Sequence, residues 1–327
     1  MGHKTTRREF LKNMALTGAA LTSLPGVVEA ADKITKPADK TRVVISTDTS
    51  CLDKDNEVVQ AAVEKMLDRS LAKLTGSGSG ADAWKKLFSS KDVVGIKINC
   101  LFGIGVSTRP EVVNAVIAGL LTAGVKEDNI IVWDRSSVDL IKCGYTPNKD
   151  GAGVKYFADD DSWGPLIERG AFKGRISTVI NEKVTAIVNM PILKTHGITG
   201  ISGCLKNHYG SFDNPGNHHA NNCNPQLADF NAIPVVKNKT RLVVMDVIRP
   251  QHSGGPGLQV RDQFNHYSIM LGTDPVAVDC VGLKIIQDKL RQMNLEPISD
   301  KKLRWMASAQ ERGVGTCDAS KIELLRA

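Results

Sequence analysis

The sequence has 327 residues and lacks several patterns that would assign it to a known class of site. It contains no CxxC pair, no GxSxG motif, and no GxGxxG motif after the first predicted strand. The first absence argues against zinc ribbons and ferredoxin-type clusters, the second against a serine hydrolase, and the third against a Rossmann dinucleotide enzyme. Residues 31–195 also contain no histidine.

Histidine is instead concentrated in one part of the chain. After residue 30, all six histidines lie between His196 and His266, and four belong to the stretch KTHGITGISGCLKNHYGSFDNPGNHHANNC. This stretch also holds Cys204, Lys206 and Cys223. Imidazole is a common metal ligand and titrates near neutral pH. The segment is either a functional site or a polar loop with solvated histidines, and we treat it as the candidate site.

The first 30 residues resemble a twin-arginine export signal. They contain the series TRREFLK, then a weakly apolar run, and then the small-residue pattern VEA before Ala31. The run is too short and too rich in Gly and Thr to span a membrane comfortably. The resemblance implies recognition by the twin-arginine export machinery and a periplasmic location. Such substrates cross the membrane folded, often with a cofactor already inserted. We therefore expect residues 31–327 to form the mature domain, with no transmembrane span.

The net charge of the mature chain is mildly basic. The predicted signal carries four basic and two acidic residues, so its removal lowers the formal net charge from +7 to +5. The charges are spread along the chain without a run of one sign. This pattern favours a small anionic ligand or a membrane surface, and it argues against nucleic acid as a partner.

The seven cysteines leave several pairings open. Cys100 and Cys280 lie in apolar contexts and are expected to be small buried hydrophobic residues. Cys204 and Cys223 bracket the histidines. They can ligate a metal, form a disulfide after export, or remain free thiols.

The order of predicted elements indicates an α/β fold. Near-continuous apolar runs, typical of strands buried on both faces, occur at Thr41–Ser46, Val93–Ile98, Asn129–Trp133, Val184–Met190, Arg241–Met245 and Tyr267–Leu271. Helical periodicity occurs at Asp55–Lys73, Pro110–Ala123, Pro275–Arg291 and Asp300–Arg312. Thr108 and Asp274 are predicted N-caps, and Trp84–Phe88 a short turn. We expect a single domain with a mostly parallel sheet, flanking helices and an irregular Gly/His-rich ligand segment.

Polar side chains follow several predicted strands at the point where each strand ends. They are Asn99, Asp134, Arg135, Lys194, His196 and Asp246. Ligands of such folds gather outside the carboxyl ends of the strands, so these residues are expected at one edge of the sheet. Lys97 interrupts an apolar strand, where it either extends its amine to the strand end or binds an anion.

Several segments spread along the chain together carry a family resemblance. They are VVGIKIN, TRPEVVNAVIAGLLTAGV, AIVNMPILKTHGITGISGCLKNHYG, RLVVMDVIRPQHSGGPG, LGTDPVAVDCVG and ASAQERGVG. With these segments the chain resembles the domain-of-unknown-function family numbered 362 over nearly the whole mature part. Some members are described as iron–sulfur proteins because they carry an added ferredoxin-like cysteine motif. This chain lacks that motif, which argues against an iron–sulfur cluster here.

A more distant resemblance is to the nickel-pincer lactate racemase family. It rests on the histidine–glycine–lysine segment from His196 to Lys206. The resemblance implies that Lys206 attaches the cofactor or binds its phosphate, and that His196 transfers protons or ligates metal. His218 or His219 would be a further ligand or base.

Residue type and position in the sequence give three groups of candidate site residues. Glycines let the backbone approach an anion, and Lys206 adds positive charge. The catalytic candidates are His196 and Lys206. The candidates for binding a cofactor are Lys97, Asn99, Lys194, Gly200, Gly203, Asn207 and Asp246. The candidates for ligating a metal ion or metal-containing cofactor are His208, His218, His219, His252, Cys204 and Cys223, with His252 placed by a second glycine-rich loop.

Two functions from different classes fit these residues. One is a cofactor-dependent periplasmic oxidoreductase or isomerase in which histidines ligate metal and move protons. The other is a non-catalytic metal- or anion-binding accessory protein.

Overall fold

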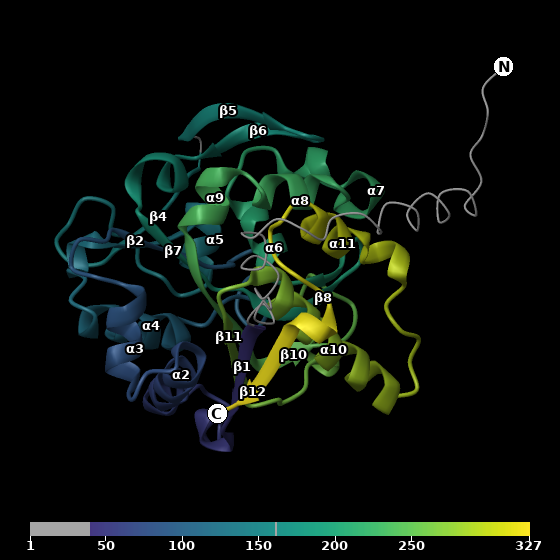
Figure 1. Cartoon of the computed structure of the whole chain (residues 1–327), viewed down its shortest axis with the longest axis horizontal. Coiled ribbons are helices and arrows are strands. Elements are labelled where there is room, and N and C mark those ends of the chain that lie inside the picture. The colour runs from purple at the N-terminus through teal and green to yellow at the C-terminus, as the bar shows by residue number, and fades with distance from the viewer. Residues whose placement is uncertain (1–39, 161) are drawn as a thin grey trace, which may run out of the picture. The chain divides into compact units, whose positions relative to one another are not determined.

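A ten-stranded sheet runs through the part of the chain that the computed structural model describes, residues 40–160 and 162–327 (Figure 1). The predicted export signal lies outside the described residues. The order of strands is β12-β1-β11-β10-β7-β2-β3-β4, and β8 pairs with β10 and β9. The strands of this sheet are β1 (Thr41–Thr47), β2 (Val94–Lys97), β3 (Ile130–Asp134), β4 (Lys155–Ala158), β7 (Ala186–Asn189), β8 (Ile192–His196), β9 (Gly200–Ser202), β10 (Thr240–Gln251), β11 (Ser268–Gly272) and β12 (Ile322–Arg326).

Most neighbouring strands of this sheet are parallel. The exceptions are β11, which is antiparallel to β1 and β10, and the antiparallel pair β8–β9. Every residue of β2, β3, β7 and β11 is buried, as expected for apolar strands covered on both faces. The predicted α/β fold with a mostly parallel sheet is therefore confirmed. Two further strands, β5 (Trp163–Arg169) and β6 (Phe172–Ser177), form a separate antiparallel pair.

Helices cover both faces of the sheet and bury one apolar core on each side (Figure 1). One face is covered by α2 (Gln60–Thr75), α3 (Gly80–Leu87) and α4 (Pro110–Thr122). The opposite core includes residues of α6 (Cys204–Asn207), α8 (Gln226–Asn231), α9 (Pro234–Lys239), α10 (Pro275–Gln292) and α11 (Arg304–Glu311). The remaining helices are α5 (Ser137–Lys142) and α7 (Ala220–Cys223). No helix in the described residues is both long enough and apolar enough to cross a bilayer.

Local hydrogen bonding explains where the helices differ from the prediction. The predicted cap Thr108 instead donates its hydroxyl to the Met190 carbonyl, so α4 begins after Arg109 without a side-chain cap. The expected short turn at Trp84–Phe88 is part of α3, whose first turn is capped by the Ser79 hydroxyl. Asp274 caps α10 as predicted, accepting hydrogen bonds from the backbone N–H groups of the first turn.

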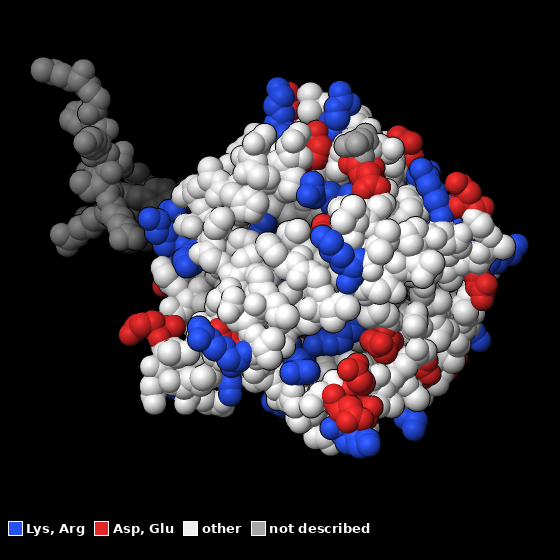
Figure 2. Space-filling model, turned by 180° about the vertical axis from the view of Figure 1, so that it is seen from behind, with Lys and Arg blue, Asp and Glu red and all other residues white. Residues whose placement is uncertain are grey.

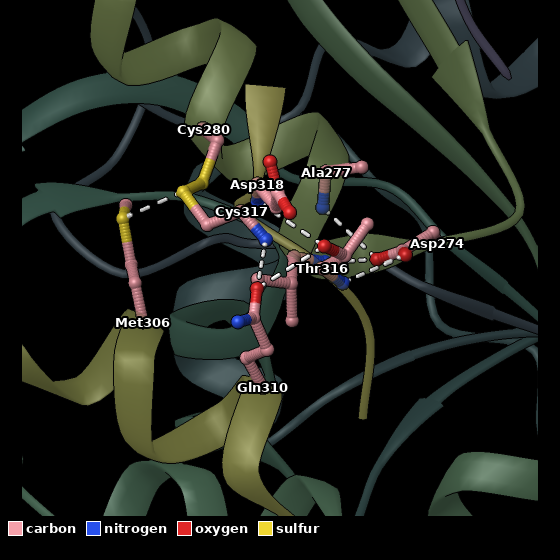
Figure 3. Close-up of a disulfide and its surroundings, with 9 residues drawn as sticks. Asp274, Ala277, Cys280, Met306, Gln310, Thr316, Cys317 and Asp318 are labelled. Atoms are coloured by element: carbon pink, nitrogen blue, oxygen red, sulfur yellow. Dashed lines mark hydrogen bonds between the residues drawn. A yellow bond between two sulfur atoms is a disulfide. The ribbon is translucent and has the colours of Figure 1, made fainter. Parts of the chain in front are cut away.

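A disulfide joins α10 to the segment that precedes β12. Cys280 is bonded to Cys317, which lies 37 residues further along the chain (Figure 3). The prediction that Cys280 is simply a buried hydrophobic residue was wrong, because its partner is distant in sequence. The backbone N–H of Thr316 donates a hydrogen bond to the Asp274 carboxylate at the start of α10. This hydrogen bond is a second link between α10 and the segment that contains Cys317. Cys100 is a buried free thiol, as expected.

Candidate ligand-binding site

A cavity of about 380 Å³ lies beside the ends of several strands of the sheet. Its wall is formed by residues that follow β2 and β3, by β8 and the turn after it, by the segment from β9 to α6, and by Pro215, His219 and Pro256. Ligand sites of α/β folds are expected at such strand ends. The predicted site residues Asn99, Lys194, His196, Gly203, Lys206, Asn207 and His219 all line this cavity.

The short helix α6 holds Lys206 at the cavity wall. The Asp279 carboxylate, fully buried on α10, accepts hydrogen bonds from the backbone N–H groups of Cys204 and Leu205 at 2.6 and 3.1 Å. Burial is the main cause that raises the pKa of Asp279 to about 6. Gly203 precedes α6, and a Cβ at this position would lie 2.0 Å from an Asp279 oxygen. Glycine is therefore required for the close contact between α6 and α10.

Lys206 has a basic neighbour rather than an acidic one. Its Nζ lies 3.1 Å from Nε2 of His219 and 3.2 Å from the centroid of the Tyr209 ring. The side chain forms no ion pair with any carboxylate of the residues that the structure describes. Burial lowers the pKa of Lys206 to about 7, because the charged amine is removed from water.

His196 lies next to this pair in a defined tautomer. Its Nδ1 accepts hydrogen bonds from the backbone N–H groups of Ile198 and Thr199 at 3.1 and 3.3 Å, so the neutral ring carries its proton on Nε2. Burial, followed by the charge of Lys206, lowers the pKa of His196 to about 3. The rings of His196 and His219 are nearly parallel, with centroids 6.1 Å apart. Lys206, His196 and His219 thus converge, as the sequence predicted.

Lys194 is a second buried lysine at the cavity wall. Its amine donates hydrogen bonds to Oδ1 of Asn99 at 3.1 Å and to the Val106 carbonyl at 2.6 Å. Burial lowers its pKa to about 8. Like Lys206, it has no carboxylate partner within the described ranges 40–160 and 162–327. Its third N–H is left for another acceptor.

Lys97 and Asp246 occupy the expected sheet edge, but both are committed to ion pairs and neither lines the cavity. The Lys97 amine lies 2.7 Å from the Asp134 carboxylate, and the Arg109 guanidinium lies 2.5 Å from Asp246. Lys97 and Asp246 therefore hold the edge together and do not contact the cavity directly. Asn207 bonds to the Lys97 carbonyl and to Asn189, which fixes its amide at the cavity wall.

The structure does not bring the remaining candidate ligands together. The His208 ring is buried, bonds to the Ser211 hydroxyl, and lines a separate cavity of about 120 Å³. His218 stacks on Phe172 with centroids 4.9 Å apart, and His252 lines a third cavity of about 360 Å³. Cys204 and Cys223 are buried free thiols. In the described part of the chain, no group of three or more His, Cys, Asp or Glu side chains is arranged to hold a metal ion.

One of the two candidate glycines has a role in packing instead. Gly200 has a φ of +77°, and a Cβ there would lie 2.7 Å from the Ile298 side chain. Its conformation lets the β8–β9 turn pass Ile298 and does not expose the backbone to the cavity, whose wall it does not join.

The cavity also contains residues that sequence reasoning missed. They include Leu101, Phe102, Asp139, Ile198 and Tyr209. Arg135, which the sequence places with Asp134 at the end of a predicted strand, also lines the cavity. The apolar residues gave no signal, because isolated hydrophobic residues in loops are common on protein surfaces.

Comparison with known proteins assigns the chain to a family. The model for the domain of unknown function DUF362 matches residues 94–284, which is more than half of the sequence. The chain belongs to the DUF362 family. The matched part of this DUF362 protein begins at β2 and ends within α10, so it contains Lys194, His196, Lys206 and His219.

The other comparisons add little. No curated protein matches the sequence of this DUF362 member. A crystal structure of a Thermotoga maritima protein, a target of the Northeast Structural Genomics Consortium, is 13% identical with a TM-score of 0.39. The match covers 73% of this chain and spans only 60% of the length of that protein.

Proposed function

We propose that the cavity binds a small anionic ligand and that Lys206, with His196 and His219, transfers a proton to or from it. The observation that supports this proposal is the pair of buried lysines, Lys194 and Lys206, which line one cavity without a carboxylate partner among the described residues. Buried charges in proteins are normally paired, because an isolated ion loses its hydration energy. An anionic ligand would supply the missing partner.

The three side chains suit proton transfer. A lysine with a pKa of about 7 is populated as both amine and ammonium near neutral pH, which is the condition for an efficient general base or acid. Nε2 of His219 can exchange a proton with the Lys206 amine at 3.1 Å. His196 stays neutral and offers its Nε2–H as a hydrogen-bond donor. Proton abstraction and return at one carbon is the chemistry of an isomerase, which we favour over simple binding.

The resemblance to the nickel-pincer lactate racemases extends the proposal to a metal-containing cofactor. The residues fit such a group in part: the Lys206 amine is available for attachment, and His196 and His219 are nitrogen donors beside it. The group would supply hydride chemistry when bound. His208, His218 and His252 lie elsewhere and would not hold it, and Cys204 and Cys223 are buried free thiols that do not line the cavity. The side chains of Lys206, His196 and His219 would bind and orient the group.

Two substitutions of Lys206 test the proposal and distinguish covalent attachment of the ligand from binding through the lysine charge. Protein purified from its native host is analysed for metal and, by native mass spectrometry, for bound small molecules. Lys206→Ala should lose the ligand while the fold is kept. Lys206→Arg keeps the charge but not the same nucleophilic amine, so rescue by arginine would eliminate covalent attachment. Lys85→Ala on α3, an exposed lysine, is the matched control. Unaltered ligand content in Lys206→Ala would remove Lys206 from the site.

Turnover distinguishes the enzyme from the accessory protein. Ligand retention that depends on Lys206, without exchange of a substrate carbon-bound proton for deuterium in heavy water, would favour the non-catalytic alternative.

We also propose that the protein is exported to the periplasm by the twin-arginine machinery. The support within the described residues is the Cys280–Cys317 disulfide, since disulfides persist in oxidising compartments. The intact mass of protein from the periplasmic fraction tests this. It should correspond to a chain that begins at Ala31 and contains the disulfide, and a full-length reduced chain in the cytoplasm would contradict it.

A further inference from the structure

We propose that the anion carries an apolar body, an alkyl or aryl group, which lies against Leu101, Phe102 and Ile198 while its acid group pairs with the buried lysines. This inference rests on the proposed function and specifies the chemical class of the ligand. The three apolar residues line the same cavity as Lys194 and Lys206.

The mouth of the cavity has an exposed apolar rim. Leu101, Phe102 and Ile198 are 46%, 50% and 36% exposed although they line the cavity. The rim continues onto Leu258, which is 39% exposed and lies beside Gly105, a residue of the same loop as Leu101 and Phe102. Contiguous exposed apolar surface around a binding pocket marks a contact for a ligand or partner, since water solvates it poorly.

Phe102 is held at the rim in an uncommon backbone conformation. Its φ is +80°, a region that bulky L-residues rarely adopt. The loop is fixed on the C-terminal side of Phe102: the Ser107 hydroxyl donates to the Gly103 carbonyl, and the Gln263 amide donates to the Gly105 carbonyl at 2.6 Å. Strained residues of this kind concentrate at binding sites, where the surrounding contacts impose the conformation.

The rim and the positive charges are adjacent. The Lys194 amine lies 5.8 Å from the centroid of the Phe102 ring, and its unused N–H belongs to the same cavity. Much of the remaining wall is apolar, with Pro191, Ile192 and Pro256 among its members. A purely hydrophilic anion would pair with the lysines but leave this wall and rim in contact with water. An acid with an apolar body satisfies both parts.

On the face shown in Figure 2, the distribution of charged side chains does not indicate a different class of ligand. There, acidic and basic side chains are interspersed around the periphery, a few basic side chains lie nearer the middle, and wide uncharged areas lie between them (Figure 2). Charge alone therefore does not point to a polyanion as the ligand of this protein.

A series of acids tests the inference with the full chain, cleared of any retained ligand by unfolding and refolding. Acetate, hexanoate and hexan-1-ol are titrated by calorimetry at pH 6. Each buried methylene group improves affinity about fourfold, so hexanoate should bind at least about tenfold more tightly than acetate even if its chain is only partly covered. Hexan-1-ol, which lacks the acid group, should bind more weakly than hexanoate.

Variants of the protein distinguish the contribution of the apolar body to affinity from that of the acid group. Phe102→Ala should weaken hexanoate several-fold and leave acetate unchanged, whereas Lys194→Met should weaken both acids. Leu166→Ala, which removes an equally exposed apolar side chain on β5, is the control and should change neither.

Each result that contradicts the expectation would overturn a particular part of the proposal. Equal affinity for acetate and hexanoate, abolished in Lys194→Met, would overturn the apolar body and leave the proposed anion site in place. Absence of binding by both acids would overturn the anion site itself. Light scattering that shows a dimer of the full chain, lost in Phe102→Ala, would assign the rim to a second copy and overturn the inference.

Discussion

Lys194 and Lys206 differ from Lys97 in one respect that decides their chemistry. All three amines are buried, but only Lys97 has a carboxylate beside it, at 2.7 Å. The other two meet an amide, carbonyls, an imidazole and an aromatic ring. Burial therefore lowers the pKa of Lys194 and of Lys206, and an added anion would raise both again.

Binding of an acid should consequently depend on pH around neutrality. Lys206 carries its charge below its pKa of about 7 and loses it above, and Lys194 follows at about 8. Hexanoate stays ionised throughout, because carboxylic acids titrate near about pH 4 to 5. Its affinity should be highest near pH 6 and then weaken as pH rises, by up to about tenfold per pH unit near pH 7 to 8.

Calorimetric titrations between pH 6 and 9 measure this dependence. Lys206→Arg provides the control, because arginine keeps its charge and should remove the part of the decline that begins near pH 7. A wild-type affinity that does not change over this range would show that neither lysine pairs with the acid.

At the scale of elements, the start of α6 is held by a close contact with α10. The Asp279 carboxylate supplies the hydrogen bonds that the first turn of α6 needs, and Gly203 leaves room for it. Because α6 carries Lys206, a displacement of this helix would also move the amine away from His219.

Gly203→Ala should therefore destabilise the protein and weaken acid binding together. The added Cβ would lie 2.0 Å from the Asp279 carboxylate, which is fully buried, and overpacking of this kind costs about 1–3 kcal/mol. Urea denaturation measures the free energy of unfolding, and calorimetry measures hexanoate affinity at pH 6.

Gly78→Ala is the matched control for this substitution. A Cβ there would meet nothing within 4 Å, so the free energy of unfolding should change by no more than about 0.5 kcal/mol. Equal behaviour of the two alanine variants would show that the α6–α10 contact does not hold the site.

At the scale of the molecule, the Cys280–Cys317 disulfide links the last part of the chain to α10. This last part includes β12, which forms an edge of the large sheet by pairing with β1. The bond therefore connects the sheet edge to the helix that anchors α6.

Cys317→Ser should lower the stability of the whole unit. Closing a loop of 37 residues restricts the unfolded chain, and the loop-entropy model gives a loss of about 3–4 kcal/mol on removal of the bond. Thermal and urea denaturation measure the change. Reducing agent should destabilise the wild type similarly and have no further effect on Cys317→Ser, and a wild type insensitive to reduction would contradict the expectation.

The sequence by itself determined the class of the fold. The apolar runs that became β2, β3, β7 and β11 predict strands buried on both faces, since their residues differ little in polarity from one side to the other. Asp274 before a proline predicted the start of α10 correctly. The clustering of His196 and Lys206 after a strand also predicted that these residues lie together at the strand ends, where the structure has a cavity, because strand ends of parallel sheets meet at one edge.

Only the tertiary structure decided which of the similar side chains belong to the site. Lys97 and Lys194 both lie in strands, but Asp134, 37 residues beyond Lys97, neutralises only the first. His208 and His219 occur in one segment, yet His208 is buried beside a separate cavity while His219 contacts Lys206. Local sequence controls hydrogen bonding and periodicity over a few residues. Ion pairs, disulfides and cavities join residues that are distant in sequence, so packing of the whole chain selects them.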